Sequence, residues 1–329
     1  MNIIDRFPVP TGDILTVSGE HGLLEMLSVG DYGKDVNVKA DHMGLTREPD
    51  QVTHMAMLPL EEKWVITIST QYGCSMACTF CDVPKVGSGR NATVWDLMGQ
   101  VDIGLKLHPE VKSTKRLNIH FARMGEPTWN DNVLLATRYL HITYPQHHLH
   151  PVVSTMMPVQ NKCLKSFIEE WMRIKNDLCE GEAGLQLSIN STDSAERASM
   201  FNCNACSLDD IGFIVKGLVP KGRKITLNFA IAGYIIDPEV LLKHFSPEHF
   251  IIKLTPMHKT TSCGENDITT DGDYTTYEPY QEDEEALKRV GYDVLVFIAS
   301  RAEDEGRITC GNALLSGTRP FGAGVLQSA

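Results

Sequence analysis

Apolar and polar residues follow two alternating patterns along most of the chain. Short runs rich in β-branched and aromatic residues are typical of strands, and they occur at 64–69, 117–122, 151–154, 185–189, 225–231, 250–254 and 294–298. Between these runs, apolar positions recur every three to four residues, as in amphipathic helices. This second pattern predicts helices at 93–107, 131–144, 162–174, 195–199, 207–218, 238–245 and 283–290.

The regular alternation of strand and helix predicts how the chain is arranged. Strands separated by helices every ~30–40 residues form βαβ units, whose strands lie parallel in one sheet. Six such units are enough for an open or partial (βα)6 barrel, so we expect an α/β core over residues 61–300. Residues 1–60 are expected to form a small β-rich N-terminal extension, and residues 301–329 a C-terminal tail. The extension contains three short extended pieces, at 14–17, 36–39 and 52–57.

Three cysteines lie close together immediately after the first predicted strand of the core. Cys74, Cys78 and Cys81 have the spacing C-x3-C-x2-C. Three thiolates this close in sequence can bind three irons of a [4Fe–4S] cluster and leave the fourth iron open to a substrate or cofactor. Structural zinc is an alternative, but it needs four ligands, and no second pair of cysteines follows at a suitable distance. Three buried thiols that only pack as small apolar groups are the other alternative.

Composition narrows the setting in which the protein works. The odd number of cysteines, nine, is not typical of a secreted disulfide framework, and an exposed iron–sulfur cluster needs a reducing compartment. We therefore expect a cytoplasmic protein, with no segment that enters a membrane and no signal peptide. The formal net charge of −12 argues against extensive contact with nucleic acid, although a local basic face can still bind phosphates.

Several motifs resemble those of the radical SAM superfamily, and in particular of the RlmN/Cfr-like RNA methyltransferases. The resemblance covers about residues 52–315, and the motifs occur in the same order as in that family. It implies a partial (βα)6 barrel of the radical SAM type in a divergent member of the family. The motifs that carry it are 71–81, 87–93, Met124-Gly125-Glu126-Pro127 with Asn130, 255–258 and Ile308-Thr309-Cys310-Gly311-Asn312.

The resemblance also implies the cofactors and their ligands. A [4Fe–4S] cluster would be bound by the three cysteines, and its open iron would bind S-adenosylmethionine (SAM). A flavodoxin- or ferredoxin-type protein would supply the electron that cleaves SAM. Further contacts to SAM would come from positions that follow the predicted strands. These positions are Gly125, Glu126, Ser154, Ser188, Asn190 and His258, the last standing where the family has asparagine.

By the same resemblance, Cys310 is the catalytic residue of a methyltransferase of class EC 2.1.1. Its thiolate would accept a methyl group from one SAM, and a radical derived from a second SAM would remove a hydrogen atom from that methyl group. The resulting carbon radical would add to an adenine carbon of ribosomal or transfer RNA. A cysteine suits this role because a thiolate is a strong nucleophile and sulfur stabilises an adjacent radical.

The chain also departs from the family in ways that affect the release of product and the choice of substrate. Thr67 stands where the family has the second cysteine that breaks the covalent adduct, and a hydroxyl group cannot form a disulfide. Cys263 is the best candidate for a replacement thiol, whereas Cys203 and Cys206 form a C-x2-C pair without further ligands. His54 aligns with the family's general base and has a suitable pKa, although a lone histidine is more often a surface residue.

Three functions therefore remain compatible with the sequence. The first is methylation of an adenine carbon in ribosomal or transfer RNA through Cys310. The second keeps the radical chemistry but acts on a nucleotide, a peptide or another metabolite. It is favoured by Thr67, by the acidic charge and by the absence of room in residues 1–50 for the family's helical RNA-binding domain. The third is a binding module without catalysis, which the persistence of several cofactor motifs argues against.

Overall fold

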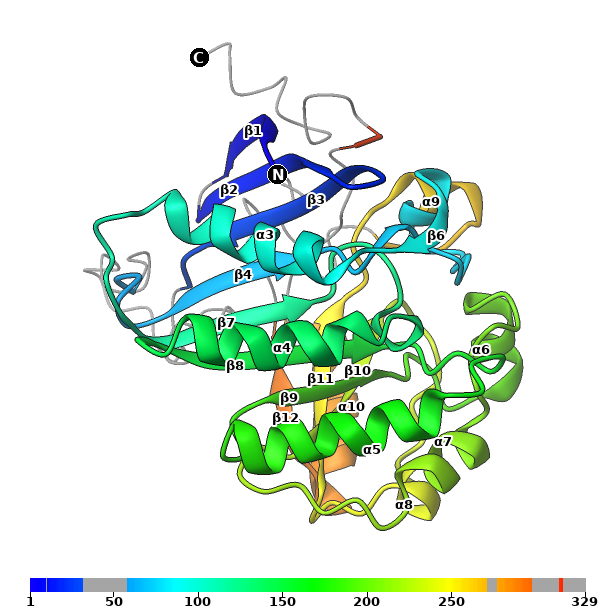
Figure 1. Ribbon diagram of the computed structural model, residues 1–329. Helices are drawn as coiled ribbons and strands as arrows, with labels where there is room; N and C mark the ends of the chain where they lie inside the picture. Colours follow the sequence, from blue (N-terminus) through cyan, green and yellow to red (C-terminus); the bar gives the residue numbers. More distant parts are fainter. Residues whose placement is uncertain (10, 32–57, 271–276, 298–313, 316–329) are drawn as a thin grey trace, which may run out of the picture.

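A single large sheet organises the molecule, as the ribbon in Figure 1 shows for a computed structural model that describes residues 1–9, 11–31, 58–270, 277–297 and 314–315. Its ten strands have the order β1-β2-β3-β4-β7-β8-β9-β10-β11-β12. The strands from β4 to β12 pair in parallel, whereas those from β1 to β4 pair antiparallel. The strands are β1 Ile3–Val9, β2 Gly12–Gly19, β3 Gly22–Val29, β4 Trp64–Ile68, β7 Thr114–Phe121, β8 His147–Thr155, β9 Gly184–Ser188, β10 Ile225–Ile231, β11 Phe250–Pro256 and β12 Asp293–Val296.

All seven predicted core strands are present, and the helices between them follow the predicted pattern. The first of these helices begins where a capping box satisfies its first backbone N–H groups, with Thr93 and Asp96 bonded to each other's backbone. The last begins at Glu278 rather than at the predicted Asp283, with Pro279 in its first turn. The helices are α3 Val94–Lys106, α4 Asn132–Thr143, α5 Leu164–Arg173, α6 Ser194–Met200, α7 Leu208–Val215, α8 Pro238–His244, α9 Thr261–Glu265 and α10 Glu278–Arg289.

The N-terminal extension is part of the same sheet. The predicted piece 14–17 lies within β2, and the pieces 36–39 and 52–57 lie outside the described residues. The strands β1 and β3 were not predicted from the sequence. In β3 the last six residues are all buried, and one of them is a glutamate. The alternation of apolar and polar residues that marks a half-buried strand is therefore missing. Because β3 pairs with β4, the extension lengthens the sheet.

The parallel strands have one face covered by helices and one opposite face, which we call the inner face. Ile66 contacts Gly104 of α3, and Phe121 packs edge-on against Trp171 of α5 at 6.1 Å between ring centroids. Figure 1 shows α3, α4 and α5 side by side over this part of the sheet. Since side chains alternate along a strand, neighbouring residues point to the inner face. The half-buried residues of that face include Thr67, His120, Ser154, Ser188, Asn228 and Lys253.

Candidate functional site

The three cysteines lie in a tight loop between β5 (Gln71–Gly73) and β6 (Ser88–Asn91), just beyond the carboxyl end of β4. Gly73 has a φ of +81°, and a Cβ atom there would lie 2.1 Å from the carbonyl oxygen of Gly87. Only glycine tolerates this close approach, which turns the chain into the loop. Cys78 is buried, and Cys74 and Cys81 are half-buried.

The three thiols are close enough to influence one another electrostatically. Burial raises the pKa of Cys74 to about 12 and that of Cys81 to about 11, and it raises the pKa of Cys78 well above its usual value. The neighbouring thiols raise the pKa values of Cys74 and Cys78 further. As metal ligands these groups must be thiolates, so binding of a metal centre would release their protons and supply the positive charge that the site requires.

The chemistry of the donor set decides which metal centre suits this loop. Within the described ranges, no set of three or more Cys, His, Asp or Glu side chains is gathered tightly enough to hold one metal ion. Iron–sulfur clusters take cysteine thiolates as ligands, whereas structural zinc takes four ligands on one ion. The donor set of three thiolates in one short loop thus fits a [4Fe–4S] cluster with one iron left open.

Helix α9 forms hydrogen bonds with the cysteine loop on one side. The Asp82 carboxylate accepts hydrogen bonds from the backbone N–H groups of Thr261 and Ser262, at 3.1 and 2.8 Å, and from the Ser262 hydroxyl at 2.7 Å. The same hydroxyl contacts the carbonyl oxygen of Cys81 at 3.0 Å. Burial would raise the pKa of Asp82, but these hydrogen bonds outweigh it and keep the pKa below its usual value. The sequence analysis missed this helix, although its hydroxyl-rich start is a capping signal.

The end of α6 and the segment that follows it form hydrogen bonds with the cysteine loop from the other side. The backbone N–H of Thr79 donates to the carbonyl oxygen of Met200 at 3.0 Å. The side chain of Asn204 donates to the carbonyl oxygen of Met76 at 2.9 Å. The loop is therefore held by two elements that lie more than a hundred residues further along the chain.

The Gly125-Glu126 motif joins the carboxyl ends of three strands. Gly125 has a φ of +93°, and a Cβ atom there would lie 2.5 Å from the Cβ of Gln71. The backbone N–H of Glu126 donates to Oε1 of Gln71 at 2.9 Å. The Glu126 carboxylate accepts from the backbone of Met156 at 2.8 Å and from both the backbone and the hydroxyl of Thr128, at 3.0 and 2.8 Å. Burial raises the pKa of Glu126, while these hydrogen bonds oppose the rise.

The remaining predicted contacts to SAM gather at the same edge of the sheet. Ser154 and Ser188 are half-buried near the carboxyl ends of β8 and β9. Asn190 follows β9 with a φ of +62°, and its side-chain oxygen accepts from the backbone of Ala230 at 3.0 Å. His258 follows β11 and is half-buried. Two further predicted residues, His54 and Cys310, lie outside the described residues.

Leu314, which follows Cys310 by four positions in the sequence, is bound to a residue pair that precedes the Gly125-Glu126 motif. The backbone N–H of Leu314 donates to Oε2 of Glu25 at 3.3 Å, and the side chain of Leu314 packs on the main core. The Glu25 carboxylate also forms an ion pair with Arg123, and neither side chain is more than 2% exposed. Arg123 lies two positions before Gly125, so this contact brings the C-terminal part of the chain to the strand that leads into the motif.

The other cysteines differ in their surroundings. Cys263 is buried in α9, and its thiol contacts the carbonyl oxygens of Phe80 and His258, each at 3.5 Å. This position is beside the cysteine loop, and Cys263 is close enough to Cys81 to raise its pKa slightly. In the C-x2-C pair, Cys203 is exposed and Cys206 is buried. Among the described cysteines outside the loop, Cys263 is the one whose thiol contacts a residue of the loop.

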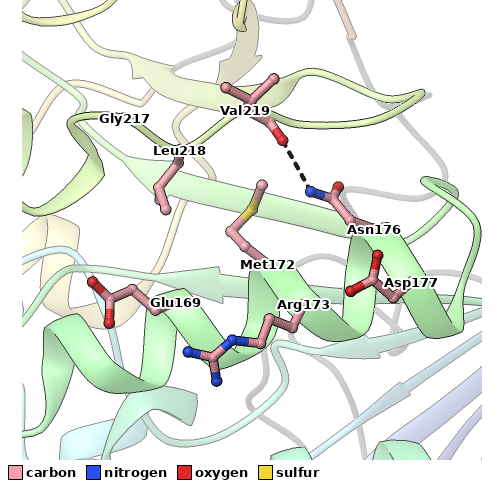
Figure 2. A pocket seen from close by; sticks show the side chains of 8 residues that line it. All are labelled: Glu169, Met172, Arg173, Asn176, Asp177, Gly217, Leu218 and Val219. Atoms are coloured by element: carbon pink, nitrogen blue, oxygen red, sulfur yellow. Dashed lines mark hydrogen bonds between the residues drawn. The ribbon is translucent and has the colours of Figure 1, made fainter.

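Two hollows have very different positions relative to this site. A cavity of about 450 Å³ adjoins the cysteine loop, and its lining residues are Gln71, Ser75, Gly89, Asn91 and Trp129. A second hollow, of about 400 Å³, lies beside α5 and the segment after α7, as Figure 2 shows. Figure 2 also shows the hydrogen bond from Asn176 to Val219 that crosses it, at 2.9 Å. It contains none of the predicted site residues.

Similarity to curated proteins connects this geometry to a family. A dual-specificity RNA methyltransferase RlmN from Sorangium cellulosum (strain So ce56) is 25% identical over 266 residues, which are 77% of this chain and 62% of that protein. The RlmN protein of Lawsonia intracellularis (strain PHE/MN1-00) is 32% identical over 187 residues, 55% of this chain and 47% of that protein. The chain is similar to RlmN RNA methyltransferases. It matches no protein-family profile.

A solved structure supports the same fold. The crystal structure of a radical SAM methyltransferase from Sphaerobacter thermophilus aligns with a TM-score of 0.63 and 17% identity, over 92% of this chain and 79% of that protein. The chain spans less than two thirds of the length of either RlmN relative described above. The likeness to this solved structure, at 17% identity, shows the fold of the chain. Among the described residues, none of the helices is both long and apolar enough to pass through a lipid bilayer.

Proposed function

We propose that this chain is a radical SAM methyltransferase that modifies an adenine carbon of ribosomal or transfer RNA through Cys310. The observation that carries the proposal is the meeting of the cysteine loop with the Gly125-Glu126 motif. Glu126 is close enough to Cys74 and Cys78 to raise the pKa values of both thiols. The similarity to RlmN proteins over most of the chain supports the RNA substrate.

In this proposal the residues at the sheet edge divide the work between the two cofactors. Cys74, Cys78 and Cys81 hold the cluster; Ser154, Ser188, Asn190 and His258 contact SAM together with the Gly125-Glu126 backbone. When bound, the cluster and SAM supply a carbon-centred radical that can remove a hydrogen atom. The Glu126 carboxylate is occupied by donors from Thr128 and Met156. Its role is therefore to orient the motif, and the backbone of the motif is what faces SAM.

The proposal assigns covalent catalysis to Cys310 and proton transfer to His54. The Cys310 thiolate would accept the methyl group of one SAM, whose methyl–sulfur bond breaks to release S-adenosylhomocysteine, and the His54 imidazole would accept a proton from the modified adenine. Release of the product cannot use a disulfide at Thr67, and Cys263 is the candidate thiol because it lies beside the cysteine loop. A flavodoxin- or ferredoxin-type donor and the cytoplasm fit the need of the cluster for electrons and for a reducing environment.

The arrangement of the chain is the structural part of the proposal. We assign residues 61–300 to a radical SAM partial (βα)6 barrel, residues 1–60 to the extension that lengthens its sheet, and residues 301–329 to the tail that carries Cys310. The contact of Leu314 with Glu25 supports a role for the tail at the sheet edge. The alternative of a small-molecule or peptide substrate is favoured by the net charge of −12.

Mass spectrometry of the anaerobically purified protein tests the function. The protein is incubated with SAM, dithionite and either transfer RNA or ribosomal RNA. The masses of the nucleosides from the digested RNA and of the peptide that contains Cys310 are then measured. We expect methyladenosine in the RNA and a methyl group on Cys310, both lost in Cys310→Ala and kept in Cys203→Ala. A methylated Cys310 without any RNA product would favour the alternative substrate. An unmethylated Cys310 in protein with a full cluster would overturn both.

A further inference from the structure

Three polar side chains project from the inner face of the sheet close to the predicted SAM site. They are His120 of β7, Asn228 of β10 and Lys253 of β11. In the strand register, Asn228 stands directly between Ser188 on one side and Lys253 on the other. His120 stands beside Thr67 of β4, and the charge of Lys253 is close enough to lower the pKa of His120. The three residues therefore share one region of the inner face.

Two of these side chains lack partners of the kind that buried polar groups ordinarily have. Among the residues that the structure describes, the buried side-chain oxygen of Asn228 has no hydrogen-bond donor. Within the ranges that the structure describes, Lys253 has no carboxylate partner, and its ammonium group lies 5.2 Å from the ring centroid of Phe297. A cation without a counter-ion, or an acceptor without a donor, costs free energy in such a place, so these groups are candidates for a role in binding.

The protonation of the two basic groups suits an anionic ligand. Burial, reinforced by the nearby Arg223, lowers the pKa of Lys253 to about 8, so the ammonium form still predominates at neutral pH. Burial and then the charges of Lys253 and Arg223 lower the pKa of His120 to about 3, so its imidazole is neutral and offers one N–H donor. Both side chains are half-buried and keep some contact with solvent. A ligand that carries a negative charge would replace the missing counter-ion.

We propose that Lys253, His120 and Asn228 form a binding site for a phosphate or carboxylate group of the substrate on the inner face. Lys253 forms the ion pair, the His120 N–H donates a hydrogen bond to the same anion, and the Asn228 oxygen accepts from a hydroxyl or N–H group of the ligand. The position beside Ser188 places the bound molecule next to the predicted SAM site. This inference rests on the proposed function for the identity of the ligand as substrate.

Titration calorimetry on the cluster-loaded protein tests the site with defined probes. The probes are inorganic phosphate, adenosine 5′-monophosphate, succinate and uncharged adenosine. We expect binding of at least one anion by the parent protein and a loss of about tenfold or more in Lys253→Met, because a charge-assisted contact is removed. Lys253→Arg retains most of the affinity. Lys243→Met, which changes an exposed lysine on α8, is the matched control and binds like the parent.

The outcomes separate this inference from the proposed function. Phosphate and adenosine 5′-monophosphate binding without succinate binding identifies a phosphate site, and the reverse identifies a carboxylate site. Equal affinities of the parent and Lys253→Met, an equal loss in Lys243→Met, or no binding of any probe would each overturn the inference. Formation of 5′-deoxyadenosine from SAM is measured separately, and we expect Lys253→Met to retain it. If the parent itself forms none, the proposed function fails, whatever the calorimetry shows.

Discussion

At the scale of single residues, the structure adds what the sequence motifs leave open, namely the atoms through which Glu126 and Asn190 are held. Glu126 was expected to contact SAM, yet both of its carboxylate oxygens are engaged by protein donors. Asn190 likewise uses its side-chain oxygen to bind the backbone of β10. A motif gives the residue type at a position, whereas the hydrogen-bond partners depend on strands that are distant in sequence. Such partners become visible only when the fold brings the strands together.

Replacement of Glu126 by glutamine tests its orienting role. The amide group of Glu126→Gln would place an N–H donor against the donors of Thr128 or Met156, and at least one buried hydrogen bond would be lost. We expect the free energy of unfolding to fall by roughly 1–3 kcal/mol, measured by urea denaturation. Glu248→Gln, at an exposed position, is the control and should change little. An unchanged stability in Glu126→Gln would show that the carboxylate does not hold the motif.

His120 makes the stability of the protein depend on pH. Its pKa is about 3 in the folded state because of burial and of the nearby charges of Lys253, Arg223 and Lys63, which Asp31 only partly offsets. The unfolded state, with a pKa near 6.5, binds a proton first as the pH falls. Stability is therefore lost between about pH 6.5 and 3. The drop between pH 7.5 and 5 should be smaller in His120→Asn than in the parent or in His141→Asn, as measured by urea denaturation.

At the scale of elements, periodicity predicted the parallel strands and the helices because each has one buried face and one more polar face. The same reasoning failed for β3, in which buried residues include Glu25, and for α9, which is only five residues long. Neither element shows a clear periodicity of apolar residues, because its position is determined by a polar contact with a residue of another element. For β3 that partner is Arg123, and for α9 it is Asp82. Contacts of this kind link segments that are far apart in sequence and leave no local pattern.

The ion pair between β3 and β7 should contribute strongly to stability. Glu25→Ala removes the carboxylate that pairs with the buried Arg123 guanidinium and that accepts from the Leu314 backbone. Breaking a buried pair by removal of one partner typically costs about 3–5 kcal/mol. We expect a loss of this size in urea denaturation at pH 7.5. Arg6→Ala, which removes a half-exposed partner of Asp13 on β1, should cost far less, and a similar loss in both variants would contradict a special role for Glu25.

At the scale of the whole molecule, the sequence predicted the order of the core and the edge at which the chemistry gathers. In a parallel sheet the carboxyl ends of the strands share one edge, so cysteines after β4 and a motif after β7 must meet. The sequence did not predict that the sheet continues through β1, β2 and β3. It also did not predict that a chain with a net charge of −12 would present Lys253 on the inner face with no carboxylate partner among the described residues. Net charge is an average over the surface and carries no information about one face.

The cluster itself can be tested on the whole protein. Cys78→Ala removes a buried ligand. We expect this variant to lose nearly all of its iron, its brown colour and the ability to form 5′-deoxyadenosine from SAM. Cys179→Ala also removes a buried cysteine but should keep the iron, the colour and the formation of 5′-deoxyadenosine. Iron analysis, visible absorption and chromatography of the SAM products are the measurements. A full complement of iron in Cys78→Ala would contradict the assignment of the ligands.

The bond between Leu314 and Glu25 has a consequence for how the protein is made. Glu25 leaves the ribosome early, whereas Leu314 is added almost three hundred residues later, since 314 − 25 is 289. A nascent or prematurely terminated chain that stops before residue 314 cannot make this contact. The bond therefore forms only after translation has passed that codon, later than the ion pair of Glu25 with Arg123 can form.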